Sequence, residues 1–130
     1  MKNYSKQREA IAEVLRKSKA HPTAAQVYSE VRKTLPNISL GTVYRNLSEL
    51  SKSGSILDIS VGDGSDHFDG DITPHLHLYC VECGAIEDVP INGDPLYAEA
   101  RAMNFSPENL ICVLNGVCKN CNDKKIKNKE

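Results

Sequence analysis

Two pairs of cysteines, each with the spacing C-x2-C, constrain this 130-residue chain more than any other feature. The first pair is Cys80 and Cys83 and the second is Cys118 and Cys121, with 34 residues between Cys83 and Cys118. Each C-x2-C turn can direct two thiolates toward one ion, and two turns complete the tetrahedral shell of structural zinc. We therefore predict one zinc ion on all four cysteines, with no open position for catalysis. The alternatives are a thioredoxin-like redox pair or unrelated buried cysteines.

The compartment of the protein bears on how its cysteines are used. No apolar run approaches the ~18 residues of a membrane span, and the N-terminus does not resemble a signal peptide, so we expect a cytoplasmic protein without a membrane partner. In a reducing compartment, cysteines are metal ligands or reactive thiols more often than disulfides. The fifth cysteine, Cys112, alternates with Leu110 and Leu114, and we expect it to be a small core residue.

Charge is distributed unevenly along the chain, although the formal net charge is only -1. Residues 1–62 contain ten Lys and Arg against five Asp and Glu, whereas residues 63–123 contain two against eleven. This asymmetry indicates two domains with different partners, a polyanion for the first and cations for the second.

The first half of the chain contains three segments with helical periodicity, followed by a hairpin pattern. The expected helices lie within residues 5–18, 21–35 and 39–54, and the hairpin within 55–69. Ser5, Thr23 with Gln26, and Ser39 are the expected N-terminal caps, while Pro36 and Gly54 end the second and third helices. In the third helix we expect Leu40, Val43, Leu47 and Leu50 to be buried.

This order of elements predicts a winged helix-turn-helix domain over residues 1–70. The third helix of such a domain enters the major groove of DNA by its N-terminal end. It would present Thr42, Tyr44 and Arg45 to the duplex, where Arg45 can contact a guanine edge or a phosphate. The alternative is that these residues form the solvated face of an ordinary helix.

The second half begins with the run HLHLY, whose alternation places His75 and His77 on one face of a strand. Two imidazoles at this spacing can bind one ion, and the nearest acidic residues are Asp69 upstream and Asp88 on an expected antiparallel strand. Mixed nitrogen and oxygen ligands suit Fe²⁺, Mn²⁺ or Zn²⁺. A pair of surface histidines without a metal is the alternative, as is one mixed site of histidines and cysteines.

The remaining segments predict a small α+β domain. We expect a helix over residues 94–105 with Leu96, Ala100 and Met103 facing inward, and a strand over 108–116 that buries Leu110 and Leu114. The lysine-rich end KKIKNKE is expected to be a frayed, solvated tail.

Four segments together resemble the ferric uptake regulator (Fur) family of bacterial metal-dependent repressors, over nearly the whole chain. They are HPTAAQVY, SLGTVYRNLSEL, FDGDITPHLHLYCVECGAIED and GVCKNC. The resemblance implies a homodimer that binds a double-stranded DNA operator through its winged helices and dimerises through a C-terminal α/β domain, residues 71–130. It also implies the cysteine-bound zinc and a second, regulatory metal at the hinge between the domains.

Carried over by position, the resemblance implies five ligands for the regulatory ion: His21, Asp69, His75, His77 and Asp88. The two aspartates resemble the peroxide regulator (PerR) branch, in which bound Fe²⁺ reacts with hydrogen peroxide and a ligand histidine is oxidised, by position His21 or His75. The expected function is therefore a peroxide-sensing repressor with Fe²⁺ or Mn²⁺ in the regulatory site.

Three alternatives stay open at the level of sequence. An iron- or zinc-uptake regulator of the same family would use the site reversibly. A shift of one residue in the strand register would substitute Glu87 for Asp88. A metalloenzyme is the third, but no nucleophile, base or pocket motif accompanies the ligands, so we expect a protein that is not an enzyme.

Overall fold

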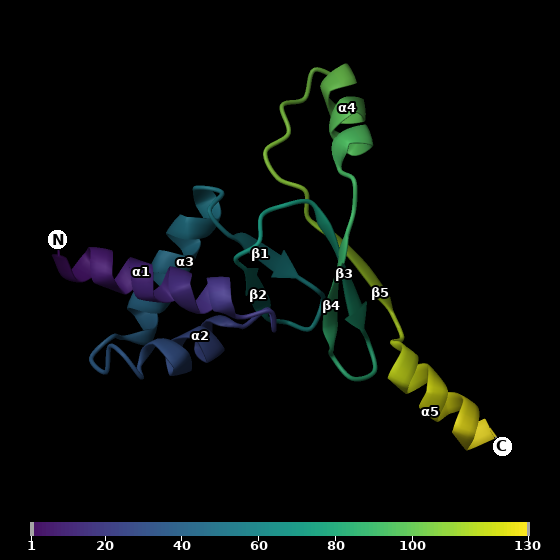
Figure 1. Ribbon diagram of the computed structural model, residues 1–130, viewed down its shortest axis with the longest axis horizontal. Helices are drawn as coiled ribbons and strands as arrows, with labels where there is room; N and C mark the ends of the chain where they lie inside the picture. The colour runs from purple at the N-terminus through teal and green to yellow at the C-terminus, as the bar shows by residue number, and fades with distance from the viewer. Residues whose placement is uncertain (1, 130) are drawn as a thin grey trace. The chain divides into compact units, whose positions relative to one another are not determined.

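The computed structural model describes residues 2–129, and the chain divides between Ile72 and Thr73 into two compact units. The first unit contains three helices and a hairpin, and the second contains a three-stranded sheet with two helices (Figure 1). The predicted α+β fold class is confirmed. None of the described helices combines the length and the apolar content that a membrane span needs.

The helices of the first unit are α1 (Lys2–Lys17), α2 (Ala24–Val31) and α3 (Leu40–Lys52). Their apolar faces meet in one core, because each contributes residues at helical spacing. The buried members of this core are Ile11, Leu15, Ala24, Val27, Val31, Ile38, Val43, Leu47, Leu50, Ile56 and Phe68. The helix predicted to start at Ser5 begins at Lys2, so Ser5 lies inside α1 and the predicted cap is wrong.

Local capping determines where α2 and α3 begin. Thr23 and Gln26 form the predicted capping box, in which each side chain accepts from the other residue's backbone N–H. Ser39 caps α3 by accepting from the Thr42 N–H at 3.1 Å, and Gly54 follows the last turn with φ 78°. Helix α2 ends at Val31, well before Pro36, because its last carbonyls are satisfied by a tighter turn over the following residues.

A two-stranded antiparallel hairpin, the wing, completes the first unit. Strand β1 (Leu57–Ser60) pairs with β2 (Asp66–Asp69), and Gly62 and Gly64 in the turn have φ 91° and 85°. Directly after β2, the chain passes very close to the end of α1. A Cβ atom on Gly70 would lie 2.9 Å from the Leu15 carbonyl oxygen. No side chain fits there unless one of the two backbones moves.

The second unit is built on β3 (His75–Cys80), the central strand of the sheet β4-β3-β5. Strand β4 (Ile86–Pro90) pairs with β3 antiparallel, and β5 (Cys112–Gly116) pairs with β3 parallel on its other side. The connection between β4 and β5 contains helix α4 (Asp94–Ala102), which is the crossover that a parallel pair requires (Figure 1).

Several burial predictions for the second unit are wrong. Helix α4 has no buried residue, Met103 is 83% exposed and Leu114 is 55% exposed, while Cys112 and Leu110 are only partly buried. Among the described residues of this unit, only His75, His77, Cys80 and Gly93 are buried. Apolar periodicity identified surfaces that must be covered, but a three-stranded sheet with two short helices does not cover them itself.

Two further expectations also fail, each for a local reason. Leu40, at the first turn of α3, is 39% exposed because this turn projects beyond the core. The C-terminal segment is a helix, α5 (Lys119–Lys129), rather than a frayed tail. Cys118 and Cys121 hold its start against the sheet, and Lys125 pairs with Glu82 at 2.9 Å.

Candidate metal centres and DNA-binding helix

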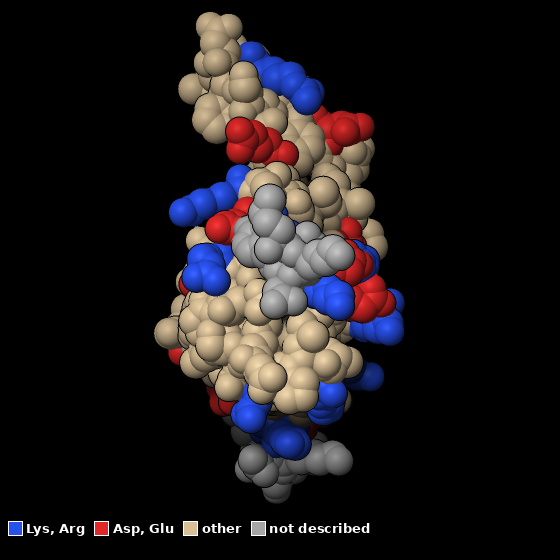
Figure 2. Space-filling model, turned by 90° about the vertical axis from the view of Figure 1, so that its left-hand side faces the viewer, with Lys and Arg blue, Asp and Glu red and all other residues tan. Residues whose placement is uncertain are grey.

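The N-terminal end of α3 presents the three residues predicted to contact DNA. Tyr44 is 55% exposed, Arg45 is exposed and Thr42 is partly buried, whereas Val43 and Leu47 on the opposite face are fully buried. On the face shown in Figure 2, Lys and Arg side chains gather at the lower end of the view, and elsewhere they lie among Asp and Glu. The exposed side chains of Tyr44 and Arg45 are available to contact phosphates or base edges.

Arg8 of α1 contacts two residues of α3, and the sequence analysis did not identify this contact. Its guanidinium forms an ion pair with Glu49 and donates to the amide oxygen of Asn46 at 3.5 Å. Asn46 is fully buried, and its own NH2 group donates to the Thr42 carbonyl at 2.9 Å. These bonds hold α3 at a fixed orientation on α1, although the residues lie about 40 positions apart in sequence.

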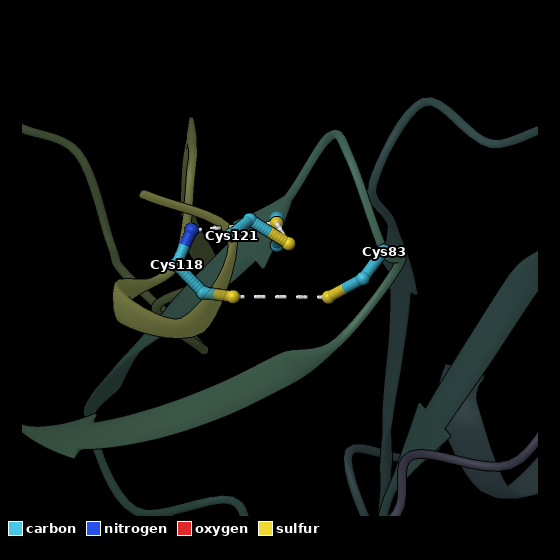
Figure 3. A group of neighbouring side chains, drawn as sticks. Cys83, Cys118 and Cys121 are labelled. Carbon is cyan, nitrogen blue, oxygen red and sulfur yellow. Dashed lines mark hydrogen bonds between the residues drawn. The ribbon is translucent and has the colours of Figure 1, made fainter. Parts of the chain in front are cut away.

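The four cysteines of the two C-x2-C pairs lie together, with one sulfur atom of each within 4.8 Å of the others. Cys80 ends β3, Cys83 lies in the following turn, Cys118 directly precedes α5, and Cys121 lies in its first turn. The Sγ–Sγ distance is 3.8 Å for Cys80 with Cys121 and for Cys83 with Cys118, and Figure 3 shows the second of these contacts. A tetrahedron with Zn–S bonds of about 2.3 Å has edges of about 3.8 Å, so this donor set fits zinc.

Hydrogen bonds and thiol contacts lower the pKa of one cysteine of the cluster and raise the pKa of another. The Cys118 backbone N–H donates to the Cys80 sulfur at 3.3 Å and lowers the pKa of Cys80 to about 6. Contact with Cys118 raises the pKa of Cys121 to about 12, because a second thiolate beside the first is unfavourable. A divalent cation removes this repulsion, which is the electrostatic reason that the cluster suits one.

A nitrogen and oxygen donor set lies on the opposite face of β3 from the cysteine ligand. The Nε2 atoms of His75 and His77 each lie 3.6 Å from the same oxygen, Oδ1 of Asp88. The strand register explains this convergence, since Asp88 is paired with His77 while Glu87 is paired with Leu78. His75 Nδ1 donates to the Thr73 carbonyl at 2.7 Å, which leaves Nε2 as the ring nitrogen directed at Asp88.

The first unit contains a second donor pair, His21 with Asp69. The His21 Nε2 atom lies 3.3 Å from Oδ2 of Asp69, and both side chains are buried. His21 has φ 53°, a left-handed conformation that is uncommon for residues other than glycine. The neighbouring Pro22 carbonyl accepts from the Phe68 N–H at 2.9 Å, which fixes this loop to β2.

His67 and Thr73 also contact these donor sets, and the sequence analysis missed both. His67 lies on β2 with its Nδ1 atom 2.8 Å from the His21 carbonyl oxygen. The alternation of DHFD places His67 and Asp69 on one face of the strand, and this signal could have identified it. The Thr73 carbonyl gives no side-chain signal, so only the structure reveals it.

The chain is similar in sequence to known proteins over most of its length. The sequence profile of the ferric uptake regulator family matches residues 2–104. The chain belongs to the ferric uptake regulator family. It is 37% identical over 123 residues to the peroxide operon regulator of Bacillus subtilis, covering 92% of this chain and 83% of that protein. It is 34% identical over 120 residues to the peroxide-responsive repressor PerR of Staphylococcus aureus, covering 91% and 81%.

A solved structure of the family has the same fold. The crystal structure of a Campylobacter jejuni peroxide stress regulator superposes with a TM-score of 0.77 at 29% identity, covering 92% of this chain and 91% of that one. As a ferric uptake regulator family member, the chain is a metal-dependent regulator of transcription. Its four-cysteine cluster fits a structural zinc ion, and its His and Asp donors fit a second metal ion.

Proposed function

We propose that this protein is a peroxide-sensing transcriptional repressor that binds its DNA operator as a homodimer when a regulatory Fe²⁺ or Mn²⁺ ion is bound. The observation that carries the proposal is the pair of donor sets, buried except for Asp88, in which three imidazole Nε2 atoms face carboxylate oxygens of their own unit. Imidazole and carboxylate donors suit Fe²⁺ and Mn²⁺. The similarity to two peroxide-responsive repressors supports this assignment.

In this proposal the five donors His21, Asp69, His75, His77 and Asp88 bind one ion. An ion that needs ligands from both units favours one arrangement of the units over all others. That arrangement sets the spacing of the two recognition helices in the dimer, so metal binding and operator binding are thermodynamically linked.

Peroxide sensing follows from the same donors. The five donors would hold Fe²⁺, which would supply the one-electron chemistry that activates hydrogen peroxide. Overall, hydrogen peroxide would be the two-electron oxidant: one of its oxygen atoms would be added to the imidazole of His21 or His75, and the other would leave as water. An oxidised imidazole loses basicity as a ligand, so its unit no longer shares the ion. The bond from His75 Nδ1 to the Thr73 carbonyl keeps Nε2 directed at the site until that happens.

The two units have different roles in this proposal. Residues 1–70 form the DNA-binding domain, in which Thr42, Tyr44 and Arg45 meet the operator, and residues 71–130 form the dimerisation domain. The second unit leaves large apolar side chains exposed on and after α4, including Leu96, Met103 and Phe105. A second copy of the chain would cover them, in the manner of a domain core divided between two subunits. The protein acts in the cytoplasm and is a sensor rather than an enzyme.

Oxygen addition after peroxide treatment tests the proposal. Trypsin cleaves at Lys19 and Arg32, so His21 is the only histidine in its peptide, whereas His67, His75 and His77 share a peptide and need fragmentation to be distinguished. In the Fe²⁺-loaded protein, dilute peroxide should add one oxygen atom to His21 or His75 and release DNA. The Mn²⁺-loaded protein is the matched control and should stay unmodified. If the Fe²⁺-loaded protein remained unmodified and bound to DNA, peroxide sensing would be refuted, and reversible regulation of metal uptake would be the remaining function.

A further inference from the structure

His67 connects the proposed ligand loop to the turn of the wing. Its ring Nδ1 lies 2.8 Å from the His21 carbonyl oxygen, and its Nε2 lies 2.7 Å from Oδ2 of Asp63. The His21 carbonyl can only accept, so Nδ1 donates to it, while Nε2 is bonded to the Asp63 carboxyl group. One partly buried side chain thereby joins two segments that are otherwise separated by strand β2.

The contact at His21 holds a backbone that needs support. A left-handed φ of 53° is costly for a residue with a side chain and persists only when its surroundings fix it. The bond to His67 and the neighbouring bond from Phe68 N–H to the Pro22 carbonyl do so from two successive residues of β2. The carbonyl that His67 holds therefore belongs to the same residue as the side chain proposed as a ligand.

The contact at Asp63 organises the exposed turn of the wing. Oδ1 of Asp63 accepts from the Ser65 N–H at 3.0 Å, which closes the turn, while Oδ2 accepts from His67. The bond with His67 lowers the pKa of Asp63, as does the bond with Ser65. An unpaired carboxylate on a DNA-binding unit repels phosphates, so the His67 bond influences both the position and the charge of this turn.

We infer that His67 is a positioning residue that transmits the metal state of His21 to the wing, and so contributes to the gain in operator affinity that the regulatory ion causes. The inference rests on the proposed function, because it needs His21 as a ligand. In the proposed function, metal binding acts on DNA through the arrangement of the two units. This inference adds a second route that lies within the first unit and runs from His21 through His67 and Asp63 to the turn at residues 62–65.

Asp63→Asn tests this route with little disturbance of the fold. The asparagine oxygen can still accept from Ser65 N–H, but no second oxygen then faces His67. Asp66→Asn is the matched control, because it removes the same charge from the same hairpin at an exposed position. His67→Gln is a second variant that removes the ring itself. The probe is a duplex selected from a random-sequence library with Mn²⁺-loaded wild-type protein.

The readout is the ratio of operator affinities with and without Mn²⁺, measured beside the Mn²⁺ affinity of the DNA-free protein. Asp63→Asn and His67→Gln should lower this ratio by about tenfold relative to Asp66→Asn, while Asp63→Asn retains the Mn²⁺ affinity of the wild type. If His67 had a merely structural role, the variants would change the operator affinities with and without Mn²⁺ by the same factor. The ratio of these two affinities would then stay unchanged. Equal ratios in Asp63→Asn and Asp66→Asn would overturn the inference. A wild-type ratio of one would instead refute the proposed function.

Discussion

Replacing Cys83 by serine removes one thiolate from the four-cysteine cluster, and we expect it to destabilise the second unit while leaving the first unit folded. The two units differ in what holds them together. Eleven buried hydrophobic side chains form the core of the first unit, whereas Cys80 is the only buried hydrophobic residue among the described residues of the second. The second unit therefore depends on zinc for stability, because a metal that binds only the folded state contributes its binding free energy to folding.

The size of the effect follows from the number of ligands. Structural zinc contributes about 10–16 kcal/mol, and one of four thiolates accounts for about 3 kcal/mol of it. For a unit of this size, that loss lowers the melting temperature by about 12–24 °C. Hydrogen exchange measured separately for residues 6–72 and 73–126 during heating reports each unit. Cys112→Ser is the matched control, since Cys112 lies outside the cluster. Equal shifts in the two variants would refute the assignment of zinc as the main support of the second unit.

Two substitution pairs test the regulatory site and the DNA-binding helix. Asp88→Ala should lower the affinity of the DNA-free protein for Mn²⁺ by about tenfold or more in a metal-competition titration, because it removes the oxygen that both His75 and His77 face. Glu87→Ala, on the adjacent residue paired with Leu78, should leave that affinity unchanged, and an equal loss would mean a shifted register. Arg45→Ala should weaken operator binding about 10- to 100-fold in a gel-shift assay with metal content unchanged, whereas Lys52→Ala removes the same charge from the end of α3 with little effect. Similar losses in both variants would mean that α3 contributes charge alone.

Local signals in the sequence predicted the elements whose limits depend on neighbouring residues. Thr23 and Ser39 start α2 and α3 because their hydroxyls satisfy backbone N–H groups three residues away. The alternation of HLHLYC placed His75 and His77 on one face of β3, and the turn after Cys80 brought β4 back antiparallel beside them. The cluster of four cysteines was predictable for the same reason, since each pair is fixed by its own turn.

Contacts between distant residues could not be predicted in this way. The bond of Arg8 to Asn46 joins α1 to α3 across 38 positions, and neither residue type indicates the other. Helix α5 was missed because its composition is that of a solvated tail, and its start is instead fixed by Cys118 and Cys121. Met103 and Leu114 were expected inside because apolar spacing shows which side chains need covering but not which molecule covers them.

The glycines around the wing differ in the substitutions that evolution can accept there. Gly62 is constrained only by the sign of its φ angle and has open space around it, so asparagine or aspartate could replace it at a modest cost. Gly70 is constrained by volume, because even a methyl group would meet the backbone of Leu15 at 2.9 Å. Among orthologues, we expect glycine or a small polar residue at the position of Gly62. The residue at the position of Gly70 should change only together with an insertion or a shift of α1.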